Sequence, residues 1–231
     1  MFKKQEPSDN TEKKAEKKIV TQEDIMKALD SCYERVLNGI PRVSPTVDDM
    51  SRDYLSKHNS PEEAAKAMHR NQIIKCTTSG FLTGFGGLIT LPVTIPANLG
   101  SVLYVQMRMI ASTAVMAGYT LDCDQTQTLV YACLAGVSVN EVLKQVGVKI
   151  GVKLANSMVK KIPGQVLTKI NQRVGFRLLT KFGTKGVINI GKMIPGVGAV
   201  IGGGLDFAET KVIANRAYSW FFEGNFSGDE E

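Results

Sequence analysis

The sequence has few residues that could carry acid–base chemistry. It contains only two histidines, His58 and His69, and both lie in its charged early region. No serine–histidine–acid set, no cysteine–histidine set and no carboxylate pair within an apolar stretch can be recognised. General acid–base and nucleophilic catalysis depend on such groups. The sequence therefore predicts a protein that is not an enzyme and that has no catalytic residues. We expect both histidines on solvated helix faces.

Cysteines are also few, and they are widely separated. The chain has four, at Cys32, Cys76, Cys123 and Cys133, and no two of them form a CxxC pair. Zinc sites and disulfide frameworks need tighter clustering than this. We expect no metal site and four reduced thiols that pack as small core residues. Reduced thiols fit a cytosolic environment.

Nucleotide and nucleic-acid signatures are missing, although the chain has 22 glycines. No GxxxxGK[ST] string occurs, and the glycine-rich run at 198–204 lacks both the dinucleotide fingerprint and a preceding strand. Aromatic residues make up only 7% of the chain, whereas nucleic-acid surfaces interleave aromatic with basic side chains. The sequence predicts no cofactor and no nucleic-acid partner.

Strand patterns are absent too, and helix signals recur along the chain. Thr21 with Asp24, and Ser60 before Pro61, have the composition of helix starts. The remaining periodicity predicts helices at about 45–57, 97–118, 125–135, 139–161, 165–182 and 206–222. We expect an all-α, compact multi-helix bundle. Its single domain should cover residues 21–222, between a disordered charged tail at 1–20 and an acidic, mobile tail at 223–231.

The N-terminal residues are polar through Lys18 and show no secretory leader. Their lysines are diluted by acidic residues, so the segment is either a solubilising tail or a basic membrane arm.

Two apolar elements rich in glycine and proline are the most distinctive part of the chain. The first runs from Cys76 to Met107, 32 positions without an acidic or basic residue, and the second covers residues 193–205. Their glycines and prolines are Gly80, Gly84, Gly86, Gly87, Pro92, Pro96, Pro195, Gly198 and Gly202. A membrane-spanning helix needs about 20 apolar residues, but prolines divide the first run. We expect two helical hairpin elements, which either enter a membrane or form the bundle core; close helix packing through glycine suits both settings.

Two isolated charges lie beside these elements. Arg108 stands between Met107 and Met109, and Asp206 directly follows the second glycine-rich run. A buried charge is costly unless it is paired. Our hypothesis is that Arg108 and Asp206 form a structural ion pair that joins the two elements. In the alternative, each side chain reaches solvent independently.

Charge is distributed unevenly in the second half of the chain. The stretch from Lys144 to Lys192 contains eleven lysines and arginines and no acidic residue, in a chain of net charge +6. Two interpretations stay open: the basic residues form the solvated face of two helices, or they form a surface that faces anionic lipid headgroups.

The glycine- and proline-rich strings resemble the EcsC protein family. The resemblance begins in GFLTGFGGLITLPVTIPANL at 80–99, continues in QMRMIA at 106–111 and AGY at 117–119, and returns in IPGVGAVIGGGLD at 194–206. It covers roughly residues 60–222. It implies a helical bacterial protein with a membrane link, because the family takes its name from a protein encoded beside an ABC exporter; it implies no reaction. Asn98 stands where the family usually has an acidic residue.

These observations predict a non-enzymatic, membrane-associated accessory or adaptor protein at the cytoplasmic face of the membrane. It would dock through residues 76–118 and 193–205, peripherally or embedded by a hairpin, with membrane lipid and a membrane protein as partners. One alternative is a soluble cytoplasmic bundle that binds a lipid or another hydrophobic ligand in a glycine-lined cleft. Another is a membrane-permeabilising protein. The mean hydropathy of −0.04 argues against many membrane spans. The oligomeric state is left open.

Overall fold

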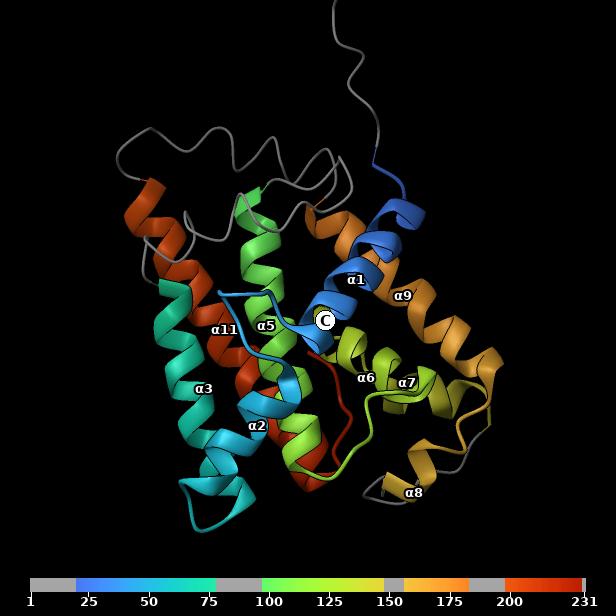
Figure 1. Ribbon diagram of the computed structural model, residues 1–231. Helices are drawn as coiled ribbons and strands as arrows, with labels where there is room; N and C mark the ends of the chain where they lie inside the picture. Colours follow the sequence, from blue (N-terminus) through green and yellow to red (C-terminus); the bar gives the residue numbers. More distant parts are fainter. Residues whose placement is uncertain (1–19, 78–96, 148–155, 183–197, 230–231) are drawn as a thin grey trace, which may run out of the picture.

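The described part of the chain consists of α-helices joined by connections without regular structure (Figure 1). The computed structural model describes residues 20–77, 97–147, 156–182 and 198–229. The helices are α1 (Gln22–Asn38), α2 (Val47–Ser56), α3 (Pro61–Thr77), α5 (Ala97–Met116), α6 (Asp124–Ala135), α7 (Val139–Gln145), α8 (Asn156–Val159), α9 (Gly164–Phe182) and α11 (Gly198–Glu223). Within these ranges the only β-type pairing is an isolated bridge between Ile40 and Ser44. The all-α prediction is confirmed.

Local capping explains where the early helices begin. The Thr21 hydroxyl accepts a hydrogen bond from the Asp24 N–H at 3.1 Å, and the Asp24 carboxylate accepts one from the Thr21 N–H at 3.0 Å, so α1 has a full capping box. The Ser60 hydroxyl accepts from the Glu63 N–H at 3.2 Å at the start of α3. Each cap satisfies backbone N–H groups that the first helical turn leaves without partners. Both starts agree with the prediction.

One predicted helix is wrong. We expected a continuous helix over 139–161, but α7 ends at Gln145. Gly147 follows with a φ of +76°, and its N–H donates to the Lys144 carbonyl at 3.0 Å. Left-handed backbone ends a helix and favours glycine. Gly147 therefore ends α7.

The central helix of the bundle is α5. It packs against α1, α2, α3, α6 and α11, and Figure 1 shows it between α3 and α11 on one side and α1 on the other. Every side chain from Ser101 to Ala114 is buried. Residues 101–107 of the long apolar run therefore lie in the protein core. Residues 78–96 of that run lie outside the described residues.

None of the helices in the described ranges is both long enough and apolar enough to cross a membrane.

The residues after α11 pack against the bundle. Phe226 is fully buried beside Trp220, with ring centroids 5.3 Å apart, and the Trp220 indole N–H donates to the Ser227 carbonyl at 2.7 Å. The Phe226 carbonyl accepts hydrogen bonds from the backbone N–H groups of Val139 and Asn140 at 3.1 and 3.2 Å. We expected a mobile tail here; the packed unit instead continues through residues 224–229, because an aromatic side chain anchors the segment.

His69 is not on a solvated helix face, contrary to expectation. Its side chain lies between α3 and α5, where Nε2 is 2.7 Å from the Thr113 hydroxyl. Burial lowers the pKa of His69 from 6.5 to about 4. The neutral imidazole is therefore the form that the folded protein holds.

A pH dependence of stability follows from this burial. Between pH 6.5 and 4, His69 takes up a proton in the unfolded chain but not in the folded one, so the free energy of unfolding falls as the pH falls. Between pH 7 and pH 5 we expect this group to reduce stability by about 2 kcal/mol. Urea unfolding at both pH values measures the loss. His69→Gln should remove this component, whereas His58→Gln should retain it; equal pH profiles for wild type and His69→Gln would contradict the assignment.

The cysteines described by the structure are free thiols. Cys32 and Cys133 are buried, and Cys123 is half-buried at the start of α6. Burial raises the pKa of both buried thiols to about 12. Protonated thiols of this kind behave as small core residues. The Cys76 side chain lies outside the described residues.

Candidate functional site

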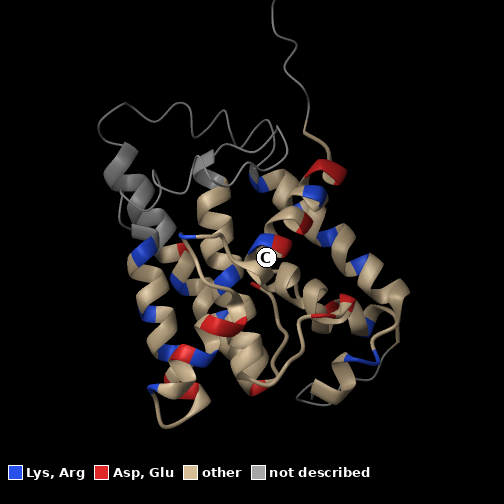
Figure 2. Cartoon of the chain, in the orientation of Figure 1, with Lys and Arg blue, Asp and Glu red and all other residues tan. Residues whose placement is uncertain are grey.

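The stretch from Lys144 to Lys192, which has no acidic residue, forms part of one side of the molecule. Lys160 and Lys161 are exposed just after α8 and Lys169 is exposed on α9, and Figure 2 shows basic residues along α9. The opposite face of α9 is buried against α6, α1 and α7. Its buried apolar residues are Val166, Leu167, Ile170, Val174 and Leu178. This division explains the amphipathic pattern of residues 165–182, because the apolar face anchors α9 while the charged face stays accessible.

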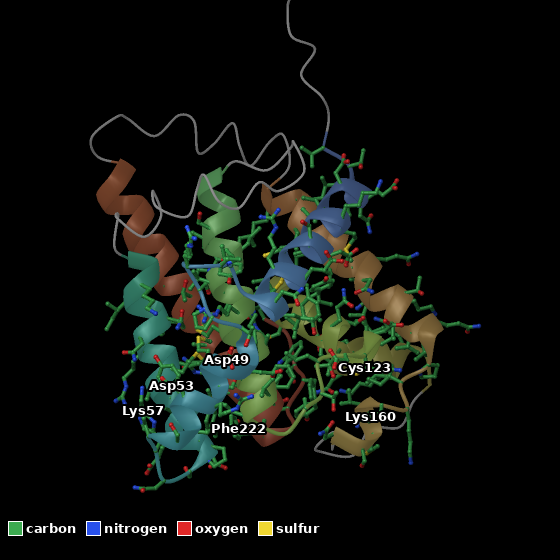
Figure 3. All side chains as sticks on the ribbon, in the orientation of Figure 1. Asp49, Asp53, Lys57, Cys123, Lys160 and Phe222 are labelled. Carbon is green, nitrogen blue, oxygen red and sulfur yellow. The ribbon has the colours of Figure 1, made fainter. Side chains whose placement is uncertain are left out.

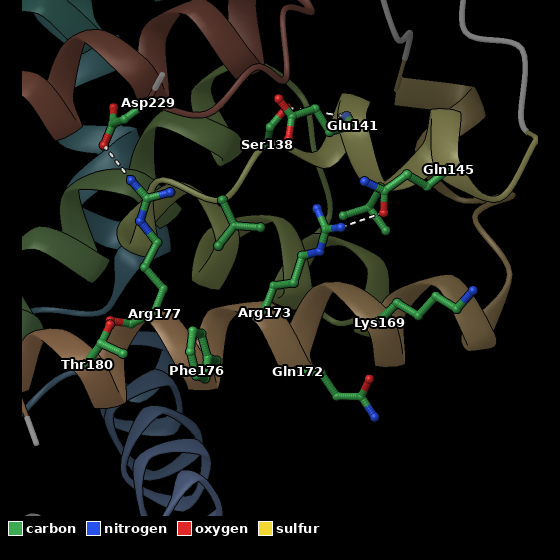
Figure 4. A pocket seen from close by; sticks show the side chains of 12 residues that line it. Ser138, Glu141, Gln145, Lys169, Gln172, Arg173, Phe176, Arg177, Thr180 and Asp229 are labelled. Carbon is green, nitrogen blue, oxygen red and sulfur yellow. Dashed lines mark hydrogen bonds and ion pairs between the residues drawn. The ribbon is translucent and has the colours of Figure 1, made fainter. Parts of the chain in front are cut away.

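Between α9 and α7 lies an open groove of about 940 Å³ (Figure 4). We call it the α7–α9 groove. Its lining residues are Val137, Ser138, Glu141, Val142, Gln145, Lys169, Gln172, Arg173, Phe176, Arg177, Thr180 and Asp229. The volume lies within the range of small-molecule sites, about 300–1,000 Å³.

One wall of the groove carries the cations. Lys169, Arg173 and Arg177 follow one another at four-residue spacing, which places them on neighbouring turns of α9. Figure 4 shows the two arginines extending from α9 across the groove, with Arg173 donating a hydrogen bond to the Gln145 side chain of α7. Phe176 lies between them in sequence and is 64% exposed. The wall therefore combines fixed positive charge with an accessible aromatic ring.

The other wall and one end of the groove carry carboxylates. Glu141 belongs to α7, and Asp229 reaches the end of the groove from the C-terminal segment. Asp229 lies 3.7 Å from the Arg177 guanidinium and also pairs with Arg216 of α11. Arg216 is nearly buried and donates to the Cys133 carbonyl as well. The Asp229 carboxylate therefore lies between two guanidinium groups, those of Arg177 and Arg216.

Arg108 is one of the two isolated charges for which the sequence left burial in an ion pair and access to solvent as alternatives, and it is buried. Its residue exposure is 6%, and one guanidinium nitrogen donates to the Pro45 carbonyl at 3.2 Å. Burial lowers the pKa of this guanidinium. Asp206 lies in α11, but its side chain is outside the described residues. The Arg108–Asp206 pair stays a prediction, which a double-mutant cycle can test.

Most of the glycines and prolines singled out in the sequence lie outside the described residues: Gly80, Gly84, Gly86, Gly87, Pro92, Pro96 and Pro195. Gly198 and Gly202 belong to the first turns of α11. The second glycine-rich element and the terminal helix thus share one helix from residue 198 onward.

Sequence patterns did not reveal the second wall of the groove. The basic face of α9 follows from its periodicity, but Glu141, Gln145 and Asp229 have no motif in common. They meet Arg173 and Arg177 only because α7 and the C-terminal segment pack across α9. Within the described ranges, no group of three or more His, Cys, Asp or Glu side chains is arranged to hold a metal ion.

Comparison with known proteins gives a family but no characterised relative. The EcsC protein family model matches residues 5–221, which extends the resemblance over residues 60–222 toward the N-terminus. The curated proteins and the solved structures that were searched gave no match. Because the family model covers nearly the whole chain, including α1, α2 and both glycine-rich elements, the protein belongs to the EcsC protein family.

Proposed function

We propose that this EcsC-family chain is a non-enzymatic accessory or adaptor protein that docks peripherally on the anionic surface of a membrane. The docking surface is the exposed side of α8 and α9, which we call the α8–α9 basic surface. It consists of Met158, Lys160, Lys161, Lys169, Arg173 and Phe176. Cytoplasmic leaflets carry negative surface potential, so the location that we propose for this docking is the cytoplasmic face.

The observation that supports this proposal is that exposed apolar side chains accompany the cations, Phe176 on α9 and Met158 in α8. Phe176 is 64% exposed and Met158 is 40% exposed, although both are large and apolar. Lysine and arginine beside exposed aromatic and aliphatic side chains are typical of interfacial helices, whose apolar groups enter the headgroup region while the cations meet phosphate. Each such cation contributes about 1 kcal/mol near an anionic bilayer.

The docking surface that we propose differs from the one that the sequence suggested. We expected residues 76–118 and 193–205 to meet the membrane. Within these ranges the side chains from Ser101 to Ala114 are enclosed by neighbouring helices, and residues 78–96 and 193–197 lie outside the described residues. A buried helix can contact lipid only if the bundle opens. The α8–α9 basic surface needs no such opening, because all its side chains except the half-buried Arg173 are already exposed.

The test compares two charge reversals in the full chain. We expect Lys169→Glu/Arg173→Glu to lower partitioning onto vesicles containing phosphatidylglycerol by at least about tenfold, because two attractive contacts of about 1 kcal/mol each become repulsive. Vesicle co-sedimentation at low and at physiological salt measures the partitioning, and wild-type binding should weaken with salt.

The matched control makes the same change in net charge elsewhere. Arg52 and Lys57 are exposed on α2, and Figure 3 shows Lys57 on the opposite side of the view from Lys160. Arg52→Glu/Lys57→Glu should reduce partitioning by less than about threefold, because only the general charge of the protein changes. Equal losses in the two variants would refute docking through the α8–α9 basic surface. Release of entrapped dye would support the permeabilising alternative instead.

A further inference from the structure

We infer that the α7–α9 groove is a site for one lipid headgroup, and that it selects a phosphodiester carrying a single negative charge. The glycerol phosphodiester of phosphatidylglycerol has this chemistry. The inference rests on the proposed membrane docking and adds a specific site to it: a diffuse basic surface attracts any anionic lipid, whereas a site of defined charge distinguishes among them.

The charge around the phosphate position explains the selectivity. Asp229 is paired with both Arg177 and Arg216 at one end of the groove, which leaves Lys169 and Arg173 facing Glu141 in the rest of the lining. This part of the groove therefore holds one net positive charge. A phosphodiester has one negative charge, whereas a phosphomonoester has about −1.5 to −2 at pH 7. The diester is neutralised there, but the second charge of a monoester would meet the Glu141 carboxylate.

The arrangement of the cations explains how a phosphate can be held next to carboxylates. At one end of the groove the Asp229 carboxylate pairs with the guanidinium of Arg177, and the same carboxylate pairs with Arg216. Arg173, one turn away, contacts only the neutral amide of Gln145 among the described side chains. A guanidinium binds an oxyanion much more strongly than an amide oxygen. Arg173 and Lys169 are thus the cations that an incoming phosphate would bind.

Phe176 favours a lipid as the source of the phosphodiester. It lines the groove beside Arg173 and Arg177 and is 64% exposed. A headgroup in the groove would place the glycerol backbone and the first methylenes of its acyl chains against this ring, which would bury apolar surface that water now covers. A nucleic-acid strand also carries phosphodiesters, but it would need successive aromatic side chains on which to stack its bases. The groove lining has one aromatic residue.

The experiment measures selectivity between two lipids at equal surface charge. Vesicles of phosphatidylcholine carry either phosphatidylglycerol or half as much phosphatidate, and flotation measures the bound fraction of the full chain. We expect wild type to bind the phosphatidylglycerol vesicles about fivefold more tightly, since one extra charge near the surface is worth about 1 kcal/mol. Arg173→Gln should lower binding to phosphatidylglycerol by about tenfold, the loss of one charge-assisted contact.

Glu141→Gln tests directly whether the charge of the groove sets the preference for a singly charged phosphate. Glu141 is exposed, and glutamine is tolerated three residues after a serine cap, so the fold should be retained. With one carboxylate fewer, the preference should shift toward phosphatidate by about fivefold. Glu62→Gln, on the exposed first turn of α3, makes the same change in net charge far from the groove. It should shift the preference by less than about twofold.

The outcomes separate this site from the proposed docking. If wild type binds both vesicles equally, or if Glu141→Gln and Glu62→Gln behave alike, the headgroup site is refuted while peripheral docking stands. If wild type binds neither vesicle, the docking proposal itself fails. Displacement from phosphatidylglycerol vesicles by a single-stranded oligonucleotide at a comparable phosphate concentration would overturn the lipid assignment in favour of nucleic acid.

Discussion

Phe226→Ala is expected to lower the free energy of unfolding by about 3–5 kcal/mol, the usual loss for a large aromatic side chain removed from a core. The residue lies after the last helix, in a segment whose composition is that of a polar tail. Its ring is nevertheless fully buried, between Trp220 at 5.3 Å and Phe221 at 6.2 Å from centroid to centroid. Deleting it leaves a cavity that the two rigid rings cannot fill by relaxation.

Phe176→Ala is the matched control for this prediction, because the same atoms are removed from an exposed position. We expect a change within about 0.5 kcal/mol. Urea unfolding followed by tryptophan fluorescence suits both variants, since Trp220 packs directly on Phe226. If Phe226→Ala were as stable as Phe176→Ala, residues 224–229 would not be part of the folded unit, and Asp229 would not be held at the groove.

Gly136→Ala is expected to cost about 3 kcal/mol. Gly136 ends α6 with a φ of +72°, a conformation that costs an L-residue roughly 1–2 kcal/mol. A methyl group there would also lie 2.5 Å from the Asp229 carboxylate and 3.2 Å from the Arg216 guanidinium. The carboxylate must then move away from Arg216, and weakening the contacts of a nearly buried guanidinium costs about another 1–3 kcal/mol.

Gly147→Ala separates the backbone cost of a positive φ from the cost of displacing the Asp229 carboxylate. Gly147 has a φ of +76°, but among the described residues no atom other than those of its chain neighbours lies within 4 Å of the position that its methyl group would take. This variant should show only the backbone cost, about 1–2 kcal/mol. The excess cost in Gly136→Ala should largely disappear when Asp229→Ala is combined with it, because the clashing group is then gone. Equal costs for the two glycine variants would show that Asp229 does not lie against Gly136.

The charged surface of α9 could be recognised from the sequence, but the groove could not. A stretch without acidic residues and a helical period are enough to place lysines and arginines on the exposed face of an amphipathic helix. The charge that the groove presents depends on Glu141 and Asp229 as well. Neither residue is distinctive in the sequence, and Asp229 belongs to a segment that we interpreted as a tail.

His69 and Gly147 show the same limit. A histidine in a polar stretch of helix reads as exposed, yet α3 packs this one against Thr113 of α5. A glycine four residues before another fits close helix packing, but it fits a helix end equally well. Only its backbone angle distinguishes the two roles.

The sequence by itself determined the all-α class, the capped starts of α1 and α3, the buried and exposed faces of α9, and the family. The all-α class, the helix starts and the two faces of α9 depend on hydrogen bonds and side-chain spacing within three or four residues, so they can be predicted from local sequence. The family follows from the glycine- and proline-rich strings. The tertiary structure alone decided the burial of Phe226, the surroundings of His69 and the charge of the groove. These depend on contacts such as the one between Arg216 and Cys133, 83 residues apart. Such contacts form only when all the helices have packed, and no local pattern specifies them.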